Sequence, residues 1–174
     1  AGGPGDLHGA SITQQLVFTG GELLAEDVAL TCYDITFGAS VQLSYGFEAH
    51  GKVDLASAKI AGQLDCKGGK FLAEPTALQC NSITVGEHAF FLDGFEAQGE
   101  VDLANAKIAG QLDCAGGKFL AEAAALDCSA MSNGPDASVR LGAVGLGGVD
   151  LSGPKLGAQR TCTCGPLRAV AHTV

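Results

Sequence analysis

Residues 46–74 read GFEAHGKVDLASAKIAGQLDCKGGKFLAE, and residues 94–122 read GFEAQGEVDLANAKIAGQLDCAGGKFLAE, displaced by 48 positions. An older copy of the same unit lies upstream, between Ala10 and Glu26, and a partial copy begins at Val149. Self-similarity at a fixed period of this size is typical of solenoids and other repeat architectures. The chain is therefore expected to build its core by stacking units on one another.

Each 48-residue unit divides into four pieces, which begin VDLASAKI, LDCKGGKF, LQCNSITV and AFFLDGFEA. Within a piece, apolar residues alternate with polar ones, as in a strand with one buried face. The strands are short and are separated by Gly, Ala, Asn or Ser turns, which does not suit the hairpins of an ordinary sandwich. The pattern predicts an all-β fold, a single-stranded β-helix (β-solenoid) in which two pieces make one coil of about 23 to 25 residues.

This register predicts two inward columns of side chains. One column contains Leu7, Cys32, Leu55, Cys80, Leu103, Cys128 and Leu151, and the other contains Phe18, Leu43, Cys66, Phe91, Cys114, Leu141 and Cys162. They indicate about seven coils, stacked at roughly 4.8 Å in a rod on the order of 30 Å long. The expected boundaries are a lead-in over 1–5, the solenoid over 6–165 and a tail over 166–174. Relative to the earlier units, the third unit is expected to have one extra residue in the segment 132–138 and one residue fewer in the segment 142–148.

Composition excludes several classes of protein. The 174 residues include 26 Gly, one Met and no Trp, which leaves little bulk for a conventional two-layer core. The net charge of −9 argues against direct nucleic-acid binding, which needs a basic surface. No apolar run approaches the roughly 18 residues that cross a bilayer, so we expect no membrane span. The compartment stays open: cytoplasmic if all cysteines are free, or an extracellular filament if a targeting segment was removed before Ala1.

The seven cysteines are expected to be core residues. Cysteines in one column lie two coils apart, about 9.6 Å, which is beyond the reach of a disulfide. A buried cysteine behaves as a small hydrophobic residue. Cys162 and Cys164 form an isolated Cys-x-Cys, which is a weak metal signal without further ligands. We therefore expect no metal and no cofactor.

The acidic residues are regularly placed and form the candidate interaction face. Asp54, Asp102 and Asp150 recur at one outward position, with Asp127 between them, while Asp65 and Asp113 form a shorter ladder on the opposite face. Two apolar residues, Val17 and Phe90, are predicted to point outward on a common face and to form a contact strip. A solvated face with intermittent ion pairs is the simpler interpretation of the carboxylates.

The runs VDLASAKIAGQLDC and VDLANAKIAGQLDC resemble the bacterial pentapeptide-repeat proteins, through the spacing of five from Leu55 to Ile60 and from Cys66 to Phe71. The resemblance implies a right-handed, four-sided β-helix. It is interrupted where longer segments, such as 72–76, break the count of five. Some members of that family protect DNA gyrase from quinolones and are thought to imitate the charge of a DNA duplex. The resemblance thus implies a topoisomerase as one partner for the acidic face.

No catalytic residues are predicted, because a ladder of carboxylates on a convex rod offers no cleft for general acid–base chemistry. The ends of an uncapped solenoid expose unpaired strand edges, which a second copy of the chain can cover. The leading hypothesis is a non-enzymatic structural protein that associates with itself end to end, into dimers or a filament. A DNA-mimicking regulator of gyrase is the second hypothesis, and an interaction module of a larger surface protein is the third.

Overall fold

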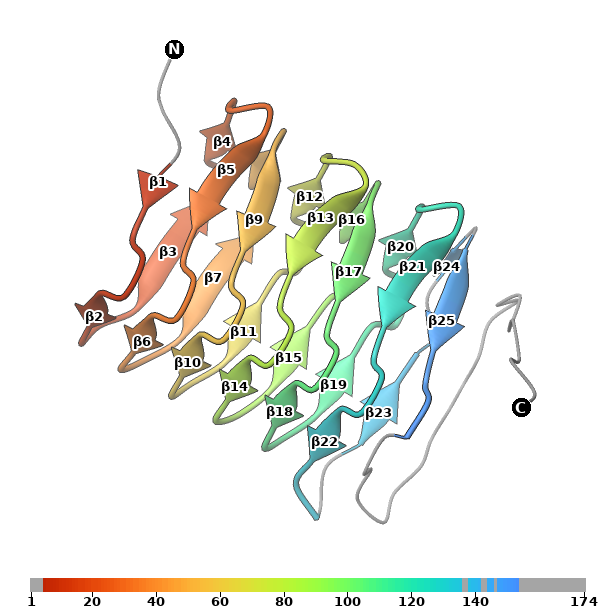
Figure 1. Cartoon of the computed structure of the whole chain (residues 1–174). Helices are drawn as coiled ribbons and strands as arrows, with labels where there is room; N and C mark the ends of the chain where they lie inside the picture. Colours follow the sequence, from red (N-terminus) through yellow and green to blue (C-terminus); the bar gives the residue numbers. More distant parts are fainter. Residues whose placement is uncertain (1–4, 136–137, 142–143, 146, 154–174) are drawn as a thin grey trace.

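The computed structural model describes residues 5–135, 138–141, 144–145 and 147–153. These residues form 25 short strands, and none of them is helical. The strands belong to four parallel sheets, which wind around one core as successive coils of a single chain. Figure 1 shows the strands of one sheet lying side by side across the stack, all pointing in the same direction. The predicted all-β solenoid is confirmed.

Each coil contributes one strand to each sheet, and we name the sheets A to D in the order in which the chain passes through them. Sheet A contains β1 (Gly5–Asp6), β5 (Val28–Thr31), β9 (Lys52–Asp54), β13 (Thr76–Gln79), β17 (Glu100–Asp102), β21 (Ala124–Asp127) and β25 (Gly148–Asp150). Sheet B contains β2 (Ser11–Ile12), β6 (Thr36–Phe37), β10 (Lys59–Ile60), β14 (Thr84–Val85), β18 (Lys107–Ile108) and β22 (Ser132–Asn133). Sheet C contains β3 (Leu16–Thr19), β7 (Val41–Ser44), β11 (Leu64–Asp65), β15 (Ala89–Phe90), β19 (Leu112–Asp113) and β23 (Val139–Arg140). Sheet D contains β4 (Glu22–Leu23), β8 (Glu48–Ala49), β12 (Lys70–Phe71), β16 (Glu96–Ala97), β20 (Lys118–Phe119) and β24 (Val144–Gly145).

The coils alternate between two lengths. In sheet A, Asp6 pairs with Thr31 and Thr31 pairs with Asp54, so a step of 25 residues is followed by a step of 23. The same alternation continues along the sheet as far as Asp150. Two successive coils therefore make one 48-residue repeat. The described residues contain six coils with a strand in every sheet, followed by β25 of a seventh.

Tight corners join sheet A to B and sheet C to D, and several of them share one construction, in which an aspartate accepts the backbone N–H two residues later. At the A–B corner of the third coil, Asp54 Oδ1 accepts a hydrogen bond from the Ala56 backbone N–H at 3.0 Å. The next residue, Ser57, adopts a φ of 59°, which turns the chain. At the C–D corner of that coil, Asp65 Oδ1 accepts from the Lys67 N–H at 3.1 Å, and Gly68 has a φ of 63°. Aspartate suits this place because its short side chain can satisfy a nearby backbone donor.

The core consists of columns of apolar side chains that run along the rod. The two predicted columns lie inside: Cys32, Leu55, Cys80, Leu103, Cys128, Leu43, Cys66, Phe91, Cys114 and Leu141 are all buried, and Leu7, Phe18 and Leu151 are partly buried. Beside them, aromatic rings from successive coils stack from Phe18 through Phe47, Phe71 and Phe95 to Phe119, with centroids 5.2–6.0 Å apart.

The alternation of coils determines how these rings fit. The second and fourth coils carry Phe-Glu-Ala at sheet D, and the third and fifth carry Gly-Lys-Phe, so the phenylalanine stands two residues earlier in the register in one kind of coil than in the other. The Gly keeps that space open. A Cβ on Gly69 would lie 2.5 Å from the Leu43 carbonyl oxygen and 3.2 Å from the Phe71 ring.

The predicted insertion in the third unit is present, but its size was wrong. Sheet C resumes at Val139, which lies six positions after Asn133. Two coils earlier, Ala89 lies four positions after Val85. The segment thus gains two residues rather than one, and the following segment to β24 is shorter by two. After the insertion, Arg140 of β23 links to the preceding coil, where its Nη1 donates to Asp113 Oδ2 at 3.0 Å.

Strand β1 begins at Gly5, next to the predicted start of the solenoid at residue 6. The predicted end at residue 165, the tail over 166–174, and the residues Cys162 and Cys164 lie outside the described residues. Within the described part of the chain, we find no helix with the length and hydropathy needed to span a membrane. The right-handed winding implied by the resemblance stays a prediction.

Candidate functional site: an acidic ladder and an adjoining groove

Sheet A presents one outward column of mainly polar side chains. The column contains Asp6, Thr31, Asp54, Gln79, Asp102, Asp127 and Asp150 in successive coils. The predicted ladder of carboxylates is thus interrupted in its first half by Thr31 and Gln79. Asp102, Asp127 and Asp150 occupy three consecutive coils, which places neighbouring carboxylates about one strand spacing apart, roughly 4.8 Å. We call these three residues the acidic ladder.

The carboxylates of the ladder also hold the A–B corners. Asp102 Oδ1 accepts from the Ala104 N–H at 2.9 Å, and Asp127 Oδ1 accepts from the Ser129 N–H at 2.7 Å. Asp150 makes the equivalent bond to the Ser152 N–H at 2.7 Å. The regular recurrence of Asp in the sequence is therefore explained by the corners themselves, without any ligand.

The two halves of sheet A differ in charge because one lysine becomes a glutamate in the repeat. Lys52 lies beside the ladder position, where its Nζ donates to Gln79 Oε1 at 2.8 Å and lies 3.5 Å from Asp54 Oδ2. Forty-eight residues later the same position is Glu100. In the described part of the chain, no lysine or arginine forms an ion pair with Glu100, Asp102 or Asp127. Negative charge therefore accumulates in the C-terminal half of the sheet.

This accumulation shows in the pKa values of two carboxyl groups. Burial raises the pKa of Glu100, and the neighbouring charges of Asp102 and Asp127 raise it further. Burial also raises the pKa of Asp102, partly opposed by the hydrogen bond from the Ala104 N–H, and Asp127 adds to the rise. The ionised form of both groups is thus less favoured than that of a free carboxyl group. A cation placed against them would relieve this repulsion.

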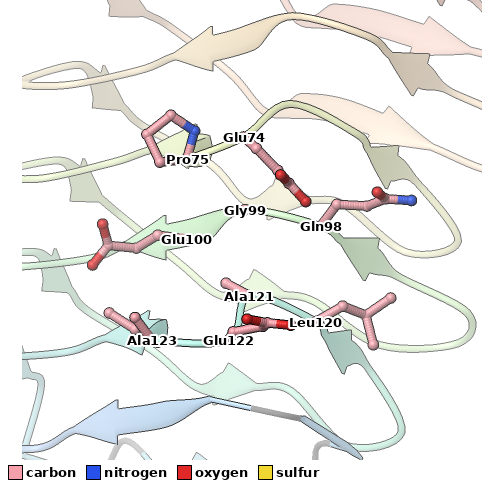
Figure 2. Close-up of a pocket in the computed structure, with 10 residues that line it drawn as sticks. Glu74, Pro75, Gln98, Gly99, Glu100, Leu120, Ala121, Glu122 and Ala123 are labelled. Carbon is pink, nitrogen blue, oxygen red and sulfur yellow. The ribbon is translucent and has the colours of Figure 1, made fainter.

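A groove opens next to the ladder, where sheet D leads into sheet A (Figure 2). The long coils make a wide corner here, over 72–75 and again over 120–123, and the short coil between them turns tightly at Gly99. The tight turn requires glycine, because a Cβ would lie 2.4 Å from the Ala73 carbonyl oxygen and 2.7 Å from that of Pro75. The short corner is recessed between the two wide ones and leaves a cavity of about 780 Å³.

Three glutamates line this groove. Glu74 lies on one wall and Glu122 on the other, while Glu100 lies at the end that adjoins strand β17 (Figure 2). Glu100 thus joins the groove to the acidic ladder. Sequence reasoning missed the groove, although the break in the five-residue count at 72–76 was the signal of its wide corner. The arrangement suits a cationic group such as a lysine or arginine side chain.

The apolar strip predicted on sheet C is not continuous. Val17 and Phe90 do occupy one outward column, but Gln42 and Asp65 lie between them in register. Phe90 is half-buried, because the Lys67 ammonium lies 4.2 Å from its ring centroid and the His88 ring stacks beside it at 5.6 Å. Phe90 is therefore already covered by its own neighbours, whereas Val17 is 47% exposed.

The cysteines that the structure describes are free and buried: Cys32, Cys66, Cys80, Cys114 and Cys128. Burial raises the pKa of these thiols, that of Cys32 to about 12, and nearby carboxylates add to the effect. A thiol that stays protonated is a poor nucleophile and a poor metal ligand. Their place in the structure is that of core residues.

Among the described residues, the large hydrophobic side chains that are exposed lie in the first two coils: Val17 at 47%, Leu24 at 66%, Tyr33 at 43% and Tyr45 at 57%. The interior residues of the first coil are also only partly buried: Leu7, Ile12, Leu16, Phe18 and Leu23. Strands β1, β2, β3 and β4 form the outermost strand of each sheet at this end. We call this surface the first-coil end.

Comparisons with protein-family models, with curated proteins and with solved structures found no match to this chain.

Proposed function

We propose that the protein is a non-enzymatic structural module that associates with other copies of itself through the first-coil end. The observation that carries the proposal is the incomplete burial of the apolar interior of the first coil, with Leu7, Ile12, Leu16, Phe18 and Leu23 only partly covered. Exposed apolar surface at the end of a solenoid favours a partner that covers it. The outermost strands β1, β2, β3 and β4 offer backbone donors and acceptors to the same partner.

A second copy of the chain fits this end because its strands have the required spacing and direction. A coil added head to tail would continue all four parallel sheets at about 4.8 Å. Such a contact uses a different surface on each partner, so it propagates unless its rotation closes a ring. Association of this kind produces short oligomers or filaments of constant width.

The experiment is sedimentation velocity across a concentration series, with negative-stain electron microscopy of the same samples. We expect larger species to grow with concentration for the wild-type chain. Leu24→Glu should suppress them, because it places a charge on the exposed end. Leu72→Glu is the matched control, since Leu72 occupies the same repeat position one unit further along the rod. A chain that stays monomeric throughout, or equal association of both variants, would contradict the proposal.

The acidic ladder supports a second candidate, a regulator that presents the charge pattern of DNA to a topoisomerase. The support is the run of carboxylates on consecutive coils, next to the acidic groove. Asp127→Asn removes one charge but keeps an oxygen that can accept the Ser129 N–H. Asp54→Asn is its control at the end that Lys52 neutralises. If the chain binds DNA gyrase, Asp127→Asn should weaken binding and Asp54→Asn should not; absence of binding would dismiss this candidate.

A further inference from the structure

The outward column of sheet D alternates in charge from Glu48 to Lys118, but not at its beginning. It contains Glu22, Glu48, Lys70, Glu96 and Lys118 in successive coils. The later members form ion pairs, with Lys70 Nζ 3.4 Å from Glu48 Oε2 and Lys118 Nζ 3.4 Å from Glu96 Oε2. At the position that is lysine in the two later repeats, the first coil has Glu22.

This exchange places two carboxylates opposite each other. Glu22 and Glu48 are direct register partners on adjacent parallel strands. Like charges in that relation destabilise a sheet unless a cation lies between them. Lys70 contacts Glu48 Oε2, whereas Glu48 Oε1 is the oxygen that lies near His50. A cation beside Glu22 would therefore relieve the repulsion between the two carboxylates.

His50 occupies that side. Its Nε2 lies 3.3 Å from Glu22 Oε1 and 3.5 Å from Glu48 Oε1. The three atoms that could ligate an ion all lie within 4.8 Å of one another. The backbone beneath them is fixed, because the N–H of His50 donates to the Leu23 carbonyl at 2.9 Å and that of Glu48 donates to Gly21 at 2.9 Å.

We propose that Glu22, Glu48 and His50 form a binding site for a divalent transition-metal ion, best matched by zinc. Zinc holds nitrogen and oxygen ligands at about 2.0–2.2 Å in a tetrahedron, whose edges are then roughly 3.3–3.6 Å long. The distances from His50 Nε2 to the two carboxylates match those edges. A mixed nitrogen and oxygen set also favours zinc over magnesium or calcium, which prefer oxygen ligands alone.

The site has an open side. The side chains are 57% exposed for Glu22, 39% for His50 and 30% for Glu48, so water can complete the coordination. The ion would join β4 of the first coil to β8 of the second. It would thus stabilise the coil at the first-coil end, whether or not that end binds a second copy. The competing arrangement without metal is a protonated His50 paired with both carboxylates.

The test is a zinc titration of the full chain after treatment with a chelator. All samples carry Cys162→Ser and Cys164→Ser, because a Cys-x-Cys pair can bind zinc by itself. Binding is followed by calorimetry, and the imidazole signals of His50 are followed in long-range proton–nitrogen spectra. We expect one zinc ion per chain, movement of the His50 signals, and a higher Tm with zinc. Magnesium should produce none of these changes.

Two variants taken from the repeat itself test the ligands. His50→Gln introduces the residue found 48 positions later at Gln98, and Glu22→Lys introduces the residue found at Lys70. Both are therefore compatible with the fold, and each should weaken zinc binding by at least about tenfold. His8→Gln is the control and should bind like the parent. No zinc binding, or equal binding by the parent and both ligand variants, would overturn the proposal.

Discussion

The column of phenylalanine rings predicts a graded loss of stability along the rod. Phe71 is fully buried and stacks on two rings, those of Phe47 and Phe95, each 5.4 Å away. Phe119 occupies the same repeat position but, among the described residues, has one ring neighbour, Phe95 at 5.2 Å; the sequence has Ala143 at the repeat position of Phe47 and Phe95. The same substitution at the two positions therefore removes different numbers of contacts from equivalent backbones.

Phe71→Ala should lower the free energy of unfolding by about 3–5 kcal/mol, the usual range for a buried phenylalanine. A ring pair contributes about 0.5–1.5 kcal/mol beyond its buried area, so Phe119→Ala should cost less by about that amount. At about 2–4 °C per kcal/mol for a chain of this size, we expect Tm to fall by about 6–20 °C for Phe71→Ala.

The assay is urea and thermal unfolding followed by far-UV circular dichroism. Lys70→Ala is the control, because Lys70 is adjacent in sequence and lies on the outward side of the same strand. It should change stability by no more than about 0.5 kcal/mol. A loss below about 1 kcal/mol for Phe71→Ala, or a larger loss for Phe119→Ala than for Phe71→Ala, would refute the continuous ring column.

Further predictions concern the corners and the charged groups. Gly99→Ala should lower the free energy of unfolding by about 1–3 kcal/mol, since its Cβ would overlap backbone atoms of the preceding wide corner; melting experiments would measure this. Arg140→Ala should lower it by about 1.5–3 kcal/mol, because the buried carboxylate of Asp113 loses a charged donor, and Arg140→Lys should restore part of the loss. The raised pKa of Glu100 means that its ionised form is disfavoured in the folded state, so stability falls as pH rises through its titration range. Glu100→Gln should therefore raise Tm at pH 7 and leave it unchanged near pH 3, where the carboxyl is protonated in both states; equal effects at the two pH values would contradict this.

The register of the core could be predicted from the sequence because the repeat fixes it. Once Cys80 and Leu103 are placed at the same inward position, the side-chain period of two determines every neighbour on those strands. The number of sheets around the core was harder to predict from the alternation of apolar residues, because each twelve-residue piece contains two strands joined by a tight corner. The corner depends on Asp54 and Ser57 adopting a particular local geometry, which the alternation of apolar residues does not reveal.

The candidate functional residues were less predictable, because they depend on contacts between coils. Phe90 reads as an exposed ring from its own strand, but Lys67 reaches it from the preceding coil, 23 residues earlier. Glu22 and His50 come together over 28 residues, and neither is retained in the later repeats. Repeat comparison identifies what the fold needs in every unit. The residues that depart from the repeat must be located in space before their chemistry can be assigned.

The alternation of long and short coils determines how the length of such a rod can change. Removal of the third or the fourth coil alone would set two even coils, or two odd ones, directly against each other, so that their phenylalanines would share one register position instead of standing two residues apart. Removal of residues 55–102 joins Asp54 to Leu103 and leaves every surviving coil on a neighbour of the opposite kind. The rod therefore grows and shrinks in increments of two coils, about 9.6 Å each. Duplication or deletion of one 48-residue unit is therefore the change in length that preserves the packing between coils.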